Sequence, residues 1–213
     1  MAVSKDGQPL PIKVLHTAMT SDLSNEAATS RYAYKAALIG AARQFDLTDE
    51  GFSWKVGGKS GVWRYADIAT VRLSYRPSSM QPRRFRADIE LADRQRVSIF
   101  STSWQTVTLM APQDRDYTAF ITQLHARMQG AGAKAALLGG LKPGLYAAGS
   151  VVVALVAISI TGLLVRALAT EEFAGALFLV GFAALFGWQI GGFMRRNRPQ
   201  SYTFEQLPKQ LLP

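Results

Sequence analysis

Two long apolar runs are the strongest feature of the chain's hydrophobic pattern. Residues 143–165 and residues 173–194 contain no charged side chain and consist mainly of aliphatic, aromatic and small residues. An α-helix rises about 1.5 Å per residue, so each run is long enough for the roughly 30 Å hydrocarbon core of a bilayer. We therefore predict transmembrane helices over residues 143–166 and 173–194.

The connection between the two runs, residues 167–172, is short, which predicts an antiparallel hairpin with both outer ends on one side. Arg166 precedes this connection, which itself contains two glutamates. Basic residues flank the other end of the hairpin at Lys134, Lys142, Arg195, Arg196 and Arg198. Because basic residues favour the cytoplasmic side, we expect a bacterial inner-membrane protein with both termini in the cytoplasm and a periplasmic turn at residues 167–172.

Residues 42–101 alternate between apolar and polar positions, with the period of two that half-buried strands have. Phe45 and Leu47 alternate in one segment, and Phe52, Trp54 and Val56 alternate in the next. Turn residues separate at least six such segments, which follow one another too closely for crossover helices. The pattern therefore predicts an antiparallel sheet.

Residues 113–128 have helical spacing instead. Acidic residues lie in the first turn and an arginine lies in the last, as the helix dipole favours. The apolar positions fall on one stripe: Tyr117, Phe120, Ile121, Leu124 and Met128. We predict an amphipathic helix that packs on the preceding sheet.

A second, less regular helical pattern lies near the N-terminus. A helix within residues 21–41 would carry Tyr32, Tyr34, Leu38 and Ile39. We therefore treat residues 1–41 as an N-terminal extension that is partly helical.

The order of strands followed by one amphipathic helix resembles the bacterial pleckstrin-homology-like domain fused to transmembrane helices. The segments that carry this resemblance are FDLTDEGFSWKVGG, WRYADIATVRLSY, ADIELADRQRVSIFSTSW and DYTAFITQLHARM. The resemblance covers about residues 42–130 and implies an α+β fold, an antiparallel barrel or sheet capped by the helix. It also implies a binding or scaffolding module without enzymatic activity.

The remaining segments complete the predicted organisation. The pleckstrin-homology-like domain spans residues 42–130, and a linker over residues 131–142 leads into the hairpin. The segment after the hairpin, residues 195–213, contains three prolines and is predicted as a cytoplasmic tail. Two alternatives are open for this tail, which is either disordered or a short docking segment.

Charge narrows the expected partners. The chain has 24 basic and 15 acidic side chains, a net charge of +9, and residues 143–213 contribute only five basic and three acidic ones. A basic domain held at a bilayer is attracted to anionic headgroups. Nucleic acid is the rival explanation of the same excess, but we do not expect it as a partner.

Two groups of basic residues are candidate contacts for anionic lipid or for a partner protein. One surrounds the glycine-rich turn at residues 57–61 and comprises Lys55, Lys59 and Arg64. The other surrounds a proline-containing loop and comprises Arg76, Arg83, Arg84 and Arg86. Solvated surface charge is the alternative interpretation of both groups. The Gly58-Lys59-Ser60 sequence is interpreted as a hairpin turn, because the first glycine of a phosphate-binding loop is missing.

No candidate catalytic, cofactor or metal site emerges. The chain has no cysteine and only two histidines, His16 and His125. His125 is expected to have a surface or capping role on the amphipathic helix. The acidic residues show no paired spacing of a general acid and base.

Small residues recur every four positions in the second apolar run, at Ala183, Gly187 and Gly191. Such a face lets two helix backbones approach closely, either within the hairpin or between two copies of the chain. We expect membrane lipids as partners, together with another membrane protein or a second copy.

The sequence therefore predicts a membrane-anchored, non-enzymatic interaction or scaffolding module, with its basic domain at the cytoplasmic face of the membrane. The alternative is a structural accessory subunit that packs through its hairpin in a larger membrane complex.

Overall fold

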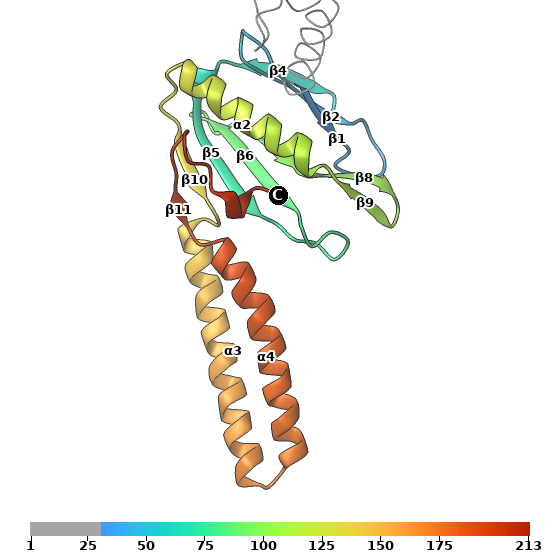
Figure 1. Cartoon of the computed structure of the whole chain (residues 1–213), viewed down its shortest axis with the longest axis vertical. Helices are drawn as coiled ribbons and strands as arrows, with labels where there is room; N and C mark the ends of the chain where they lie inside the picture. Colours follow the sequence, from blue (N-terminus) through green and yellow to red (C-terminus); the bar gives the residue numbers. More distant parts are fainter. Residues whose placement is uncertain (1–30) are drawn as a thin grey trace, which may run out of the picture. The chain divides into compact units, whose positions relative to one another are not determined.

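The computed structural model describes residues 31–213 and has a mixed α+β fold with antiparallel sheets and two long C-terminal helices (Figure 1). The described chain divides into two compact units. The first comprises residues 31–67 together with Thr102–Ala133, and the second comprises Ile68–Ser101 together with Lys134–Pro213. Each unit has its own sheet.

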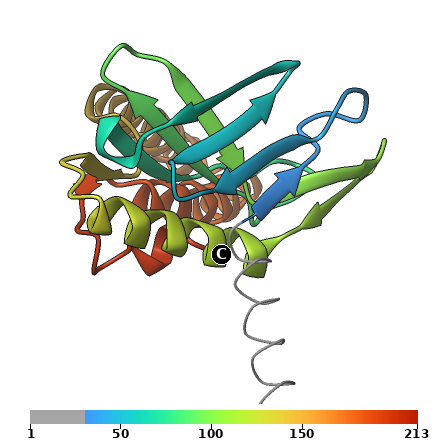
Figure 2. The same ribbon diagram turned by 90° about the horizontal axis from the view of Figure 1, so that it is seen from above.

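The first unit contains a four-stranded antiparallel sheet whose strands follow the order of the sequence. These strands are β1 (Arg31–Tyr34), β2 (Arg43–Leu47), β3 (Phe52–Val56) and β4 (Lys59–Trp63). After β4 come a short 3-10 turn, η1 (Tyr65–Asp67), a separate hairpin of β8 (Thr102–Thr106) and β9 (Leu109–Pro112), and helix α2 (Asp114–Gly130). The β8–β9 hairpin extends from the beginning of α2 (Figure 2).

Aromatic and aliphatic side chains of α2 and the sheet form the core of the first unit. All five apolar positions predicted for the helix are buried, which confirms the amphipathic helix. The ring of Tyr32 in β1 lies 5.7 Å from the ring of Phe120 and 6.0 Å from the ring of Tyr117. Rings at these separations add about 0.5–1.5 kcal/mol per pair beyond the area that they bury.

The helix predicted within residues 21–41 is wrong where the structure describes this segment. Arg31–Tyr34 is a strand, and Tyr32 pairs with Phe45 of β2 in antiparallel register. Tyr32 and Tyr34 alternate with exposed residues, so the period of two places both rings in the core. Ile39 lies beyond the strand and is 90% exposed. The part of the predicted helix before residue 31 lies outside the described residues.

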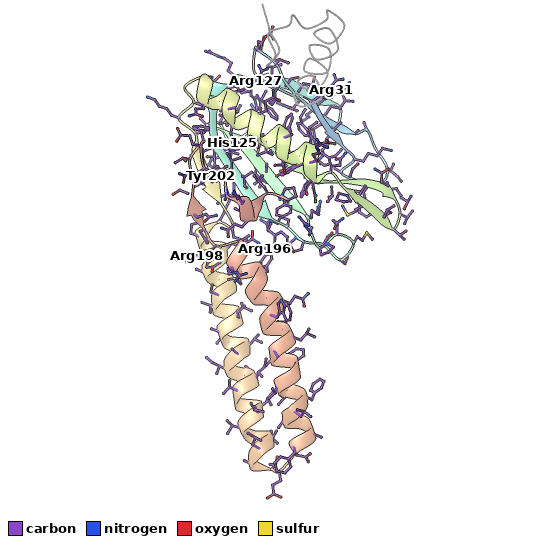
Figure 3. The ribbon with its side chains drawn as sticks, viewed as in Figure 1. Arg31, His125, Arg127, Arg196, Arg198 and Tyr202 are labelled. Atoms are coloured by element: carbon purple, nitrogen blue, oxygen red, sulfur yellow. The ribbon has the colours of Figure 1, made fainter. Side chains whose placement is uncertain are left out.

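His125 belongs to the core and not to the surface, which corrects its predicted role. It lies on α2 (Figure 3), its side chain is 0% exposed, and Nδ1 is 2.7 Å from the carbonyl oxygen of Ile121. Positions 121, 125 and 128 are spaced by four and three residues, so His125 continues the apolar stripe of the helix. Burial lowers the pKa of His125 below its ordinary value, and the hydrogen bond to Ile121 only partly opposes this shift.

The second unit contains a five-stranded sheet in the order β11-β10-β5-β6-β7. The neighbouring strands are antiparallel, except that β10 runs parallel to β5. Its buried face carries apolar side chains such as Val71, Leu73 and Ile89, which are all 0% exposed. The strands are β5 (Ile68–Tyr75), β6 (Phe85–Leu91), β7 (Arg96–Phe100), β10 (Ala136–Gly139) and β11 (Gln200–Ser201).

The described strands form open sheets, so the closed-barrel form of the prediction is wrong. The four-stranded sheet ends at β1 and β4, and the five-stranded sheet ends at β11 and β7. Strands β8 and β9 pair with each other alone. Closure of a barrel requires continuous strand pairing around the ring, and the described pairings do not provide it.

Helices α3 (Pro143–Ala169) and α4 (Phe173–Arg196) form the predicted antiparallel hairpin (Figure 1). Both are long and apolar enough to cross a membrane. No residue of α3 is buried, and large apolar side chains of α4 such as Leu177 and Trp188 are 75% and 84% exposed. An apolar surface of this extent is typical of contact with lipid and not with water.

The segments on both sides of the hairpin belong to the sheet. The predicted linker contains β10, which pairs with β5, and the predicted tail contains β11, which pairs with β10. A short 3-10 turn, η2 (Lys209–Leu211), follows, and Leu211 is 0% exposed. Of the two alternatives for the tail, the structure therefore favours the docking segment, which packs on the protein's own sheet.

Candidate functional site

One buried side chain, Asn197, joins the end of α4 to the sheet. Asn197 directly follows the helix and is 0% exposed. Its Oδ1 accepts a hydrogen bond from the Tyr75 N–H at 3.1 Å, and its Nδ2 donates to the Tyr75 carbonyl oxygen at 3.0 Å. The side-chain amide thus pairs with β5 as the peptide group of a neighbouring strand would. This contact fixes the last turn of α4 to the sheet.

The beginning of α3 is held in the same place. The Gly140 N–H donates to the Leu73 carbonyl oxygen at 2.8 Å, and the Leu141 N–H donates to the Asn197 carbonyl oxygen at 3.0 Å. Gly140 has a φ of +80°, and a Cβ atom there would overlap the carbonyl oxygens of Asn197 and Arg198. Arg196 and Arg198 lie where the hairpin joins the sheet (Figure 3), and the Arg196 guanidinium is 4.9 Å from the centre of the Tyr75 ring.

Alternation along the strands places charged side chains on the face of this sheet that is opposite to the core. Arg72 of β5, Asp88 of β6 and Ser98 of β7 are register partners, and Glu90 and Arg96 form the next row. A pocket of about 370 Å³ opens on this face. It is lined by Thr70, Arg72, Arg76, Arg86, Asp88, Glu90, Arg96, Leu138, Lys142 and Leu145.

Within the pocket, Arg86 neutralises the buried carboxylate of Asp88. The Arg86 Nε donates to Asp88 Oδ1 at 2.8 Å, and a terminal nitrogen of Arg86 lies 2.6 Å from the same oxygen. The Ser98 hydroxyl also donates to Asp88 Oδ1, at 2.5 Å. Asp88 is only 8% exposed, so this charge-assisted network holds Arg86 in place.

Four further basic side chains of the pocket have no such partner. Within residues 31–213, the side chains of Arg72, Arg76, Arg96 and Lys142 form neither a hydrogen bond nor an ion pair. The pocket contains five basic and two acidic side chains, and one of the acids is already paired with Arg86. An excess of positive charge therefore lines this concave surface.

Arg76 is the least well solvated of these cations. Its Nε is buried and has no hydrogen-bond partner among the described residues. Desolvation lowers the pKa of Arg76, repulsion from Arg86 lowers it further, and Asp88 only partly opposes the shift. Ser74, two residues earlier on the same face of β5, is 1% exposed, and its Oγ also has no partner in the described chain. Arg76, which lines the pocket, is positioned to interact with an anion there.

The pocket lies at the start of the first apolar helix. Lys142 is the residue before α3 and Leu145 lies in its first turn, and both line the pocket. No side chain caps this helix N-terminus. The free N–H groups and the dipole of a helix N-terminus favour negative charge, so α3 adds to the positive potential of the pocket.

The structure separates the four arginines predicted around the proline-containing loop. Arg76 and Arg86 line the pocket, whereas Arg83 is exposed on the loop. The Arg84 guanidinium lies 4.0 Å from the centre of the Phe100 ring. Two of the four predicted residues thus share one site.

The other predicted basic group belongs to the first unit. Lys55, Lys59 and Arg64 are exposed, and Lys59 begins β4 directly after a two-residue turn. Gly57 and Gly58 of this turn have φ angles of +58° and +80°, which confirms the hairpin interpretation. The three side chains are exposed, as the alternative interpretation of solvated surface charge expects.

Sequence reasoning missed three cations of the pocket, Arg72, Arg96 and Lys142. Arg72 could have been found, because it alternates with Val71 and Leu73 and so lies on the polar face of its strand. In the sequence, Lys142 indicates only the orientation of the hairpin in the membrane. The pairing of residues 136–139 with β5, which brings Lys142 to the sheet, has no signal in the local pattern.

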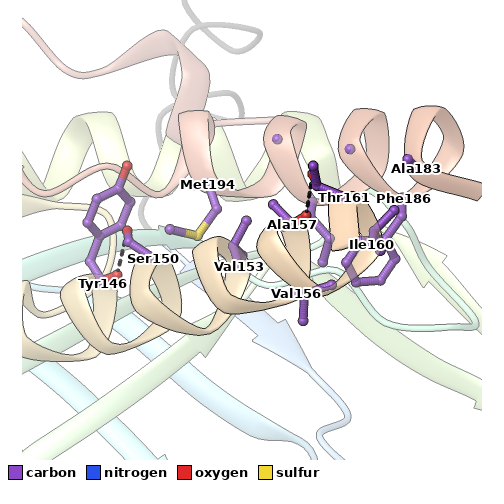
Figure 4. Close-up of a pocket in the computed structure, with 13 residues that line it drawn as sticks. Tyr146, Ser150, Val153, Val156, Ala157, Ile160, Thr161, Ala183, Phe186 and Met194 are labelled. Carbon is purple, nitrogen blue, oxygen red and sulfur yellow. Dashed lines mark hydrogen bonds between the residues drawn. The ribbon is translucent and has the colours of Figure 1, made fainter. Parts of the chain in front are cut away.

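The predicted small-residue face borders a second cavity, an apolar groove of about 460 Å³ between α3 and α4 (Figure 4). Ala183, Gly187 and Gly191 line it from α4, and side chains such as Val153 and Ile160 line it from α3. A Cβ atom added at Gly187 or Gly191 would meet no atom within 4 Å. The two glycines therefore leave open space beside the hairpin and are not in close contact with α3.

No known protein family, curated protein or solved structure matches this chain. The geometry of the sheet, the pocket and the hairpin is therefore the basis of any functional assignment.

Proposed function

We propose that the protein is a membrane-anchored, non-enzymatic interaction module. The hairpin crosses the bacterial inner membrane, both termini lie in the cytoplasm, and the folded domain is presented at the cytoplasmic face. There it binds a membrane component, either lipid or another protein.

The observation that carries this proposal is the hydrogen-bonded joint at Asn197. A flexible linker would let the domain move away from the membrane, whereas this joint ties the sheet to the last turn of α4. Because the sheet stays beside the bilayer, it meets membrane components at a high effective concentration, and modest affinity is sufficient.

The order of elements supports a pleckstrin-homology-like origin of the domain. Four antiparallel strands are followed by the three antiparallel strands β5, β6 and β7, and the long helix α2 follows. The β8–β9 hairpin and the strands beside the membrane helices depart from the simple form of that fold. The resemblance itself implies a binding role.

Cross-linking in intact membranes, followed by purification of the full chain and mass spectrometry, tests this function. We expect the protein in the membrane fraction after washing with high salt or alkaline carbonate, with cross-links from the sheet to a membrane protein or to lipid. Recovery of the intact chain in the soluble fraction would contradict the proposal.

An accessory-subunit role is the second candidate, and the groove between α3 and α4 favours it. Open space beside Gly187 and Gly191 could receive a transmembrane helix of another subunit. In that case cross-links would concentrate at α4, and replacing both glycines with leucine would release the partner. Unchanged complex size in detergent for this double variant would exclude the role.

A further inference from the structure

The basic pocket of the five-stranded sheet has the features of a built anion site. Arg86 is fixed by Asp88 and Ser98, and it keeps one wall of the pocket in place. Arg72, Arg76, Arg96 and Lys142 surround the same space. A volume of about 370 Å³ falls within the range of small-molecule sites, roughly 300–1,000 Å³.

An unsatisfied polar group indicates that an occupant completes this site. The buried Nε of Arg76, which lines the pocket, has no partner in the described chain. A buried donor without a partner costs free energy, and a phosphate oxygen is a strong acceptor for a guanidinium. Arginine is also better suited than lysine to bind phosphate through two parallel hydrogen bonds.

The position of the pocket indicates where the anion comes from. Leu145, which lines the pocket, lies in the first turn of α3, and the uncharged run begins at Pro143. One helical turn rises about 5.4 Å, so the pocket lies within roughly that distance of the start of the membrane-spanning segment. Lipid phosphates occupy this depth, between the hydrocarbon core and water. A nucleic acid or an acidic protein segment would have to reach the same narrow zone.

We propose that the pocket binds the phosphodiester of an anionic glycerophospholipid headgroup, with Arg72, Arg76 and Lys142 as its contacts. The inference rests on the proposed membrane anchoring and names the ligand class of the module. Arg96 and the N-terminus of α3 add positive potential. Arg83 and the basic turn of the first unit take no part in this site.

Binding of short-chain lipid to the purified full-length protein in neutral detergent tests the proposal. The probe is dihexanoyl phosphatidylglycerol, and native mass spectrometry or a change in thermal unfolding reports binding. Dihexanoyl phosphatidylcholine, inorganic phosphate and a glutamate-rich peptide serve as comparison ligands. We expect phosphatidylglycerol to bind at least tenfold more tightly than each of the three.

Charge-removing variants locate the site. Each basic side chain near a membrane surface contributes roughly 1 kcal/mol, so R72Q and R76Q should each weaken phosphatidylglycerol binding about fivefold, and the double variant about 25-fold. R83Q and K59Q remove the same charge outside the pocket and should leave binding within about twofold of the unmodified protein. R76K keeps the charge and should retain more affinity than R76Q.

Several results would overturn the lipid assignment. Equal affinity for phosphatidylglycerol and phosphatidylcholine would show that the charge of the headgroup does not determine binding. An equal loss of affinity in R83Q and R76Q would show that the pocket is not the binding site. Competition by inorganic phosphate would indicate a soluble phosphate ligand, and competition by the peptide would indicate an acidic protein partner. Loss of binding supports the pocket only if the variant's unfolding temperature in the absence of lipid is not lowered. The proposed anchoring is tested separately, because a chain without lipid specificity still stays in carbonate-washed membranes.

Discussion

The two compact units use charge in different ways. In the first unit an aromatic core lies under α2, and Lys55, Lys59 and Arg64 are exposed near a tight turn. In the second unit the charged side chains line a concave face, and several of them lack partners in the described chain. Among residues 31–213, the two helices that are long and apolar enough to cross a membrane belong to the second unit.

The number of basic residues in a segment therefore does not identify a binding site. Both predicted basic groups lie beside glycine or proline turns and look equivalent in the sequence. Concave shape, desolvation and the neighbouring start of α3 distinguish the pocket from the turn. Four amino-acid substitutions test whether the two units differ in this way.

Phe120→Ala should destabilise the first unit most. The Phe120 ring is 0% exposed and packs against Tyr32, so its removal should cost about 3–5 kcal/mol of unfolding free energy. Chemical unfolding of the protein in detergent measures the loss. Thr122→Ala, on the exposed side of the same helix, is the control and should change stability by less than about 0.5 kcal/mol. A similar small loss for Phe120→Ala would show that this core does not stabilise the unit.

Asn197→Ala should loosen the joint between the hairpin and the sheet. It leaves the partly buried N–H and carbonyl groups of Tyr75 without their partner, at a cost of about 1 kcal/mol for each group, the lower end of the range for unsatisfied groups. Hydrogen exchange should become faster at the Tyr75 amide and at neighbouring amides of β5. Arg198→Ala changes the exposed neighbouring residue and should leave exchange unchanged. Equal exchange in both variants would mean that Asn197 does not hold the joint.

Arg76→Gln should raise the unfolding temperature of the lipid-free protein slightly, because removal of a charge that the folded state disfavours often stabilises a protein and solvent screens much of the effect at this partly exposed site. Desolvation and the repulsion from Arg86 both disfavour the charged form of Arg76 in the folded state. Lys55→Gln removes an exposed charge from the first unit and should have no measurable effect. Thermal unfolding of the three proteins, side by side and without lipid, provides the comparison. Destabilisation by Arg76→Gln would indicate a structural role for this side chain.

The smallest expected effect is a pH dependence that arises from His125. Its pKa is lowered in the folded state, so below about pH 6.5 the unfolded chain binds the proton more readily. Stability from this residue is therefore present above pH 6.5 and is lost as the pH falls through the lowered folded-state pKa. His125→Gln should flatten the slope of unfolding free energy against pH between 7.5 and 5. An unchanged slope would place the pH dependence elsewhere.

Periodicity predicted those parts of the fold that depend on local pattern. The uncharged runs gave both long helices, and the spacing of Phe120 and Leu124 gave the amphipathic helix. The same rule, applied too loosely to residues 21–41, gave a helix where Tyr32 and Tyr34 alternate in a strand. Two apolar residues two positions apart fit a strand better than a helix, and the sequence already contained this information.

The parts that could not be predicted depend on contacts between distant segments. The sequence does not indicate that residues 136–139 pair in parallel with β5, or that the segment after α4 continues the same sheet. The role of Asn197 depends on a contact with a residue 122 positions away. The candidate site was therefore predicted only in part, because Arg76 and Arg86 lie in segments with a clear local pattern and Lys142 does not.

Labelling of single introduced cysteines reports on which side of the membrane the sheet lies, because the chain contains no cysteine of its own. Thr170→Cys places a thiol at the turn between α3 and α4, and Ser79→Cys places one on an exposed loop of the sheet. A membrane-impermeant maleimide applied to intact cells whose outer membrane has been permeabilised should label Thr170→Cys alone. Ser79→Cys should react only after the inner membrane is opened. Labelling of both positions, or of neither, before that membrane is opened would contradict a hairpin that crosses the bilayer and holds the sheet on the cytoplasmic side.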